Sequence, residues 1–166
     1  MNWSRYRFVS GFLFLASVIG MAFALYLEHV QGFEPCPLCV FQRVGLIALG
    51  TVSLIAFIHN PASNIMKRVY ALLGSVGILW SAGVAARHVW LQNLPPAQVP
   101  SCGSGLDYLV DALPIKSVLS QVLSGSGECA VVDWSFFGQS LPVWSFLFFA
   151  VLALVSLWQL FRKYPV

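Results

Sequence analysis

Charged residues are scarce in this chain. Six are acidic and nine are Lys or Arg, which together make up 9% of the 166 residues. Soluble domains carry about 25% charged residues, so a soluble protein of this size would leave too much apolar surface in water. A net charge of only +3, with no basic stripe interleaved with aromatics, argues against nucleic-acid binding. The mean hydropathy of +0.80 instead predicts an integral membrane protein.

Four apolar runs are long enough to cross the roughly 30 Å hydrocarbon core of a bilayer. They cover residues 8–27, 40–58, 69–90 and 143–161. The first run resembles a signal peptide with a cleavage site at Ala22-Phe23-Ala24, but it exceeds the about 7–15 residues of a signal-peptide core. We therefore expect it to be retained. The chain is predicted to form one all-α domain over residues 1–166, an integral membrane four-helix bundle.

Small residues in the third run allow a close approach between helices. They are Gly74, Gly77, Ser81, Gly83 and Ala85.

Aromatic residues near the ends of the runs are typical of interfacial belts. They are Tyr26, Trp90, Trp134 and Trp144.

The basic residues are distributed asymmetrically along the chain. Those on one side of the predicted bundle are Arg5, Arg7, Lys67, Arg68, Arg162 and Lys163. The opposite loops, 28–37 and 91–141, carry Lys116 alone, with Arg43 and Arg87 at the ends of spans. The positive-inside rule places the basic side and both termini in the cytoplasm. All four cysteines then lie outside, where disulfides persist.

The long loop 91–141 contains apolar residues at helical spacing on both sides of Pro114. They are Leu106, Leu109, Val110, Leu113, Ile115, Val118, Leu119, Val122 and Leu123. This pattern predicts short amphipathic helices on the membrane surface, although a cap packed on the bundle without lipid contact fits as well. Gly/Ser-rich stretches beside Cys102 and Cys129 place these two thiols on flexible segments.

Cys36 and Cys39 form a C-x-x-C pair where a polar connection becomes the second span. Pro35 and Pro37 suit the start of a helix, whose positive dipole end favours a thiolate over a thiol. Arg43 follows Cys39 by four residues and therefore shares its helical face. A labile disulfide, a fixed cation and an apolar setting predict redox chemistry with a small electron acceptor at the membrane edge.

Each candidate site residue also has a simpler interpretation. Arg43 either extends to lipid headgroups or stabilises negative charge on Cys39 or on a reduced carbonyl acceptor. His88 is either an interfacial anchor or part of the site. Four cysteines allow three pairings, and a Cys102–Cys129 bridge could be purely structural, worth about 3.5 kcal/mol. A zinc site usually needs a second C-x-x-C, so we expect no metal.

Together these features resemble the DsbB family of bacterial inner-membrane proteins, over nearly the whole chain. The most specific matches are CPLCVFQR at 36–43, the stretch from His88 to Gln92, Cys102 and Cys129, and WSFFG at 134–138 followed by LPVW at 141–144. The resemblance implies a membrane thiol:quinone oxidoreductase. Such a protein reoxidises a periplasmic DsbA-type dithiol oxidase and passes the electrons to ubiquinone or menaquinone.

The resemblance also implies an order of thiol exchanges. Reduced DsbA would attack Cys102 of a Cys102–Cys129 disulfide, and the released Cys129 would attack Cys36 of the Cys36–Cys39 disulfide. Cys39 would then be released as a thiolate beside the quinone, where Arg43 would stabilise it. We take Cys39, Arg43 and His88 as the candidate quinone-binding residues.

Two alternatives remain at this point. An enzyme similar to vitamin K epoxide reductase would run thiol–quinone chemistry in reverse, but it would need the C-x-x-C to face its acceptor from a different span. A non-enzymatic four-span scaffold would hold two static disulfides. Thiol trapping separates the scaffold from an enzyme, because catalytic disulfides cycle under mild reductant whereas static ones stay oxidised.

Overall fold

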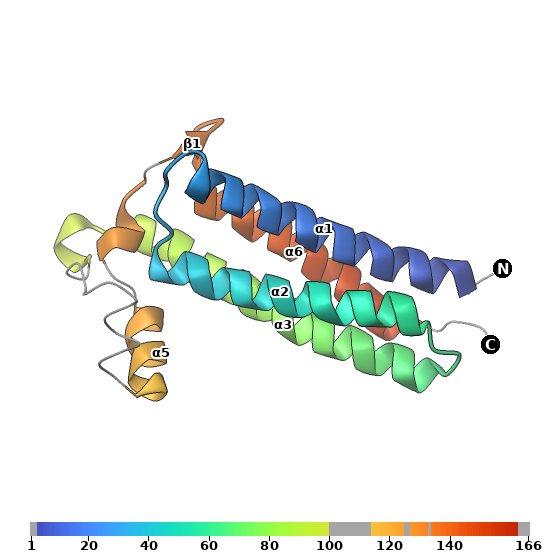
Figure 1. Ribbon diagram of the computed structural model, residues 1–166. Helices are drawn as coiled ribbons and strands as arrows, with labels where there is room; N and C mark the ends of the chain where they lie inside the picture. Colours follow the sequence, from blue (N-terminus) through green and yellow to red (C-terminus); the bar gives the residue numbers. More distant parts are fainter. Residues whose placement is uncertain (1–2, 100–113, 125–126, 133, 163–166) are drawn as a thin grey trace.

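The computed structural model describes residues 3–99, 114–124, 127–132 and 134–162 (Figure 1). In this part of the chain, four long helices are apolar enough to cross a membrane. They are α1 (Trp3–His29), α2 (Pro37–His59), α3 (Asn64–Gln92) and α6 (Leu141–Phe161). Each encloses one of the predicted runs and extends it by a few residues. The all-α, four-helix membrane fold is therefore confirmed.

The four helices lie side by side, with the two termini at one end of the bundle (Figure 1). α3 packs against both α2 and α6, and α1 packs mainly against α2. The buried core contains Leu13 of α1, Leu49 of α2, Ile78 of α3 and Leu152 of α6. Large apolar side chains also cover the outside, as expected for contact with lipid; Phe8 is 75% exposed.

α2 and α3 make a close contact through glycine. A Cβ atom on Gly45 would lie 2.3 Å from the backbone oxygen of Gly77 and 2.3 Å from Oγ of Ser81. Ser81 in turn donates a hydrogen bond of 2.7 Å to the backbone oxygen of Gln42. A Cβ on Gly83, by contrast, would meet nothing within 4 Å. Gly77 and Ser81 thus serve the predicted close approach, whereas Gly83 does not.

Buried polar side chains link the helices in the half of the bundle that contains the termini. Gln159 of α6 donates a hydrogen bond of 3.0 Å to Ser10 of α1, and the hydroxyls of Ser75 and Ser156 lie 3.0 Å apart between α3 and α6. Hydrogen bonds of this kind add specificity to helix packing inside a membrane.

We call the opposite end of the bundle, where α1 and α3 end and α2 and α6 begin, the thiol end. The described part of loop 91–141 lies here and forms η1 (Pro96–Gln98), α5 (Ile115–Ser124), η2 (Gly127–Ala130) and a hairpin of β1 (Ser135–Phe136) and β2 (Gln139–Ser140). Phe137 and Gly138 at the hairpin tip both have positive φ, 50° and 74°, as in the two-residue turns that fit the twist of paired strands. The sequence analysis did not predict this hairpin.

α5 is the predicted amphipathic helix that follows Pro114. Val122 of this helix is 3% exposed and packs in one cluster with Leu38 of α2 and Leu91 of α3. α5 therefore caps the thiol end of the bundle, beside the start of α2 (Figure 1). Its contact with lipid stays a prediction, and the helix predicted around Leu106–Leu113 lies outside the described residues.

Candidate functional site

Cys36 and Cys39 lie where α2 begins. Cys36 is the N-cap residue, Pro37 occupies the first turn, and Sγ of Cys36 accepts the backbone N–H of Cys39 at 3.4 Å. The two sulfur atoms are 2.9 Å apart and half-buried. N-cap side chains satisfy the unpaired N–H groups of a first turn, so the local sequence itself folds the two thiols against each other at the positive end of the helix dipole.

His88 lies against both thiols. It is on the last turns of α3 and only 4% exposed. Its Nε2 is 3.9 Å from Sγ of Cys36, and its Nδ1 is 3.9 Å from Sγ of Cys39. An imidazole in this position can donate an N–H to a thiolate or accept a proton from a thiol. The interfacial-anchor interpretation of His88 does not fit this burial.

Gln42 was not predicted as a site residue. It is 5% exposed, and its Nε2 lies 3.4 Å from Nδ1 of His88. Gln42 follows Cys39 by three residues and therefore shares its helical face. This spacing is the feature of the sequence that could have indicated Gln42 as a site residue.

Cys129 reaches the same cluster from η2. It is 1% exposed, and its sulfur, the sulfur of Cys36 and a ring nitrogen of His88 all lie within 4.8 Å of one another. Cys129 thus places a second sulfur within 4.8 Å of Sγ of Cys36, in addition to that of Cys39. Two thiols and an imidazole are also zinc-type ligands, and a metal-free site stays our prediction. Cys102 lies outside the described residues, so its pairing with Cys129 stays a prediction too.

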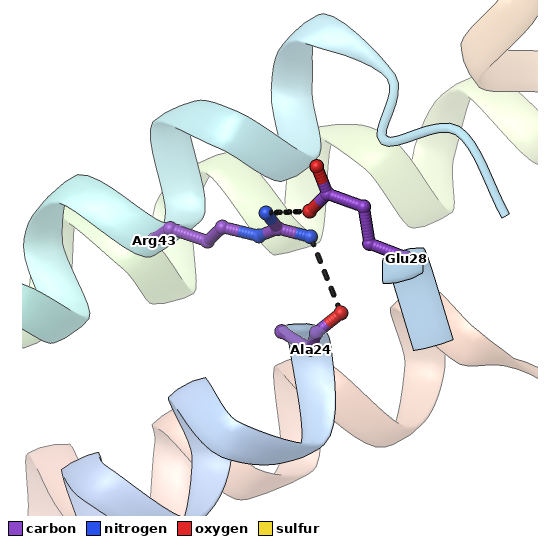
Figure 2. A network of polar contacts seen from close by, with 3 residues as sticks. All are labelled: Ala24, Glu28 and Arg43. Carbon is purple, nitrogen blue, oxygen red and sulfur yellow. Dashed lines mark hydrogen bonds and ion pairs between the residues drawn. The ribbon is translucent and has the colours of Figure 1, made fainter. Parts of the chain in front are cut away.

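Arg43 is held by α1 (Figure 2). Its Nη1 forms a charge-assisted hydrogen bond with Oε2 of Glu28, and its Nη2 donates to the backbone oxygen of Ala24 at 3.5 Å. The side chains are 20% and 25% exposed. Arg43 therefore has a protein counter-ion and does not depend on lipid headgroups. Glu28 was not predicted as a site residue, although α1 ends where α2 begins.

A cavity of about 380 Å³ brings these groups together. Its wall includes Cys36, Cys39, Arg43, Glu28 and His88. The remaining wall is mostly apolar and comes largely from α1, α2, α6 and the segment before α6; it includes Phe23, Leu46, Trp134, Trp144, Phe148 and Phe149. This volume is within the range of small-ligand sites, and so is the combination of apolar walls with a few polar groups. Trp134 and Trp144, which the sequence analysis assigned to an interfacial belt, therefore also line the cavity.

Comparison with known proteins identifies the family. Residues 6–159 match the family described as "Disulfide bond formation protein DsbB". The chain belongs to the DsbB family. Proteins named disulfide bond formation protein B include one from Acinetobacter baylyi, 70% identical over all of this chain and 96% of that protein. Another, from Acinetobacter baumannii, is 72% identical over 97% of this chain and 94% of its own length. A Psychrobacter relative is 52% identical over 95% of this chain and 92% of its own.

Membership of the DsbB family confirms the resemblance and the predicted class of function. The protein is a multi-pass membrane oxidoreductase of bacterial disulfide bond formation. This class disfavours both the scaffold with static disulfides and the enzyme similar to vitamin K epoxide reductase. Of the residues predicted for the site, Cys36, Cys39 and His88 lie together in the cavity wall, and Cys129 lies against Cys36 and His88. Arg43 is also in the cavity wall, one helical turn along α2 from Cys39.

Proposed function

We propose that this DsbB-family protein reoxidises a DsbA-type dithiol oxidase and passes the electrons to ubiquinone or menaquinone. The observation that supports this most is the apolar cavity whose wall contains both Cys39 and Arg43. We further propose a location in the bacterial inner membrane, with both termini in the cytoplasm and the thiol end in the periplasm. In support, Arg5, Lys67, Arg68 and Arg162 are all at the end of the bundle opposite the thiol end.

The residues present fit a quinone. When bound, a quinone supplies a two-electron acceptor whose carbonyl oxygens gain negative charge and then protons. Arg43 would stabilise that charge, because a guanidinium offers several donors in a fixed plane. The aromatic side chains of the wall would hold the flat ring and exclude water, which strengthens the electrostatic effect of Arg43. Cys39 shares the cavity wall and would face the same ligand.

The thiols of the chain would carry the electrons to this cavity. Cys129, released by exchange with the dithiol donor, would attack Sγ of Cys36 and displace Cys39 as a thiolate. The start of α2 and a protonated His88 would stabilise the charge on the displaced sulfur. The second thiol of the donor would then close the donor's own disulfide and free Cys102, which would attack Sγ of Cys129, restore the Cys102–Cys129 bond and release Cys36 as a thiol. Cys36 and Cys39 would form their disulfide again as two electrons and two protons pass to the acceptor. In total, two thiols of the donor become one disulfide, and two electrons and two protons reach the acceptor.

Quinone reduction by the purified protein in detergent, with a reduced DsbA-type donor, tests the proposal. We expect turnover with the native chain, and a KM for quinone about 10–100-fold higher in Arg43→Ala, the range expected for one lost charged hydrogen bond. Arg68→Ala, an exposed cation at the opposite end, is the matched control and should keep the native KM. Lack of turnover by the native chain with either quinone contradicts the proposed function. An unchanged KM in Arg43→Ala contradicts the role of Arg43 alone.

A direct bond between Cys36 and Cys129 is expected as well. In a variant with Cys39→Ser and Cys102→Ser, the two remaining thiols should form a disulfide under mild oxidation, because their sulfur atoms lie within 4.8 Å. Mass spectrometry of the linked peptides would measure its yield, and the same variant oxidised in denaturant provides the comparison. If both thiols of the folded variant remain open to alkylation after oxidation, Cys129 does not serve as the attacking thiol.

A further inference from the structure

Glu28 has no part in the thiol exchanges, yet it forms an ion pair in the cavity wall. It lies in the last turn of α1 and pairs with Arg43 across the α1–α2 interface (Figure 2). Three quarters of its side-chain surface is buried. Burying a carboxylate beside apolar side chains is costly unless the charge is compensated, and here Arg43 compensates it. The pair needs an explanation beyond the packing of α1 against α2.

Arg43 alone would be poorly positioned. An arginine near the end of an apolar span ordinarily extends toward water, and its long side chain can adopt many rotamers. In the structure Nη1 is held by Glu28 and Nη2 by the backbone oxygen of Ala24. Both anchors are on α1, four residues apart on the face toward α2 (Figure 2). These bonds use two of the five N–H donors of the guanidinium and leave the others for a ligand.

We propose that Glu28 is a positioning residue for the quinone site. It fixes the guanidinium of Arg43 in the cavity wall, so that the remaining N–H donors of Arg43 can bond to a carbonyl oxygen of the quinone. The inference rests on the proposed function. Electrostatic stabilisation is most effective when the charge is held in place before reaction. The ion pair provides that preorganisation and links it to the packing of α1 against α2. Glu28 also balances the charge of Arg43 until negative charge develops on the ligand.

Binding of a short-chain quinone to the oxidised protein, without any dithiol, tests this inference independently of turnover. Trp134 and Trp144 line the cavity, so quenching of tryptophan fluorescence reports the dissociation constant. We expect Glu28→Ala to raise it about tenfold, as loss of one charge-assisted bond would. Glu28→Asp, which keeps the charge, should restore part of the affinity, and Glu28→Gln should restore less. Gln31→Ala removes an exposed polar side chain three residues after Glu28 that does not line the cavity, and this variant should bind like the native chain.

A double variant distinguishes positioning from a direct contact between Glu28 and the ligand. If Glu28 acts through Arg43, Glu28→Ala combined with Arg43→Ala should bind no more weakly than Arg43→Ala by itself. Additive losses, or an unchanged affinity in Glu28→Ala, overturn the inference while leaving the proposed function in place. Absence of quenching in the native chain overturns both. If Glu28→Ala is not monodisperse in detergent, the Asp and Gln variants decide, and equal affinities in the two count against an ion pair.

Discussion

Replacement of Cys39 by serine is expected to reduce dithiol-driven quinone reduction to background. A serine hydroxyl cannot form a disulfide with Cys36, and at neutral pH it does not ionise to replace the thiolate beside Arg43. The fold should be retained, because Cys39 is half-buried in the first turn of α2 and its backbone N–H, which bonds to Cys36, is unchanged. Absorbance of the quinone, followed with a reduced DsbA-type donor, measures the loss.

Cys102→Ser provides the matched control for this experiment. Cys102 is predicted to meet the protein donor, so its loss should block electrons from that donor. A small dithiol can reduce the half-buried Cys36–Cys39 pair directly, and with such a donor Cys102→Ser should still reduce quinone while Cys39→Ser should not. Turnover by Cys39→Ser with either donor would remove Cys39 from the route and with it the electron path proposed above.

The sequence allowed much of the fold to be predicted, for clear physical reasons. In a bilayer each span must satisfy its own backbone hydrogen bonds, so hydropathy alone locates the long helices. Pro35 and Pro37 located the start of α2, and helical periodicity placed Arg43 one turn from Cys39. These are local properties of the chain, and they located the C-x-x-C pair and the cation without knowledge of the packing.

The partners of these residues depend on how the helices pack, and the sequence alone did not identify them. The Glu28–Arg43 pair joins two helices across their interface, and hydropathy does not predict which polar residues come into contact there. His88 was interpreted as either anchor or site residue, and only its position against Cys36 and Cys39 in the structure distinguishes them. The β1–β2 hairpin was missed because Phe137 has a positive φ, a conformation that aromatic residues rarely adopt.

Gly45→Val is expected to destabilise the bundle by about 3 kcal/mol, the upper end of the usual cost of overpacking. The first added carbon already conflicts with the backbone oxygen of Gly77 at 2.3 Å, and a backbone atom cannot rotate away as a side chain can. α2 and α3 would have to separate, and the bond from Ser81 to Gln42 would lengthen. Because Gln42 contacts His88, the displacement should also reach the thiols and lower the turnover.

Gly83→Val tests whether this cost arises from the α2–α3 contact or from a valine in a helix. Gly83 is on α3 as well, but a Cβ there meets nothing within 4 Å, so its replacement should leave the free energy of unfolding within about 0.5 kcal/mol of the native value. Denaturant titration of both variants in the same detergent gives the comparison. An equal loss in both variants would assign the cost to the valine itself, and a native-like stability of Gly45→Val would mean that α2 and α3 can separate at little cost. The position of His88 against the thiols would then not depend on the close approach at Gly45.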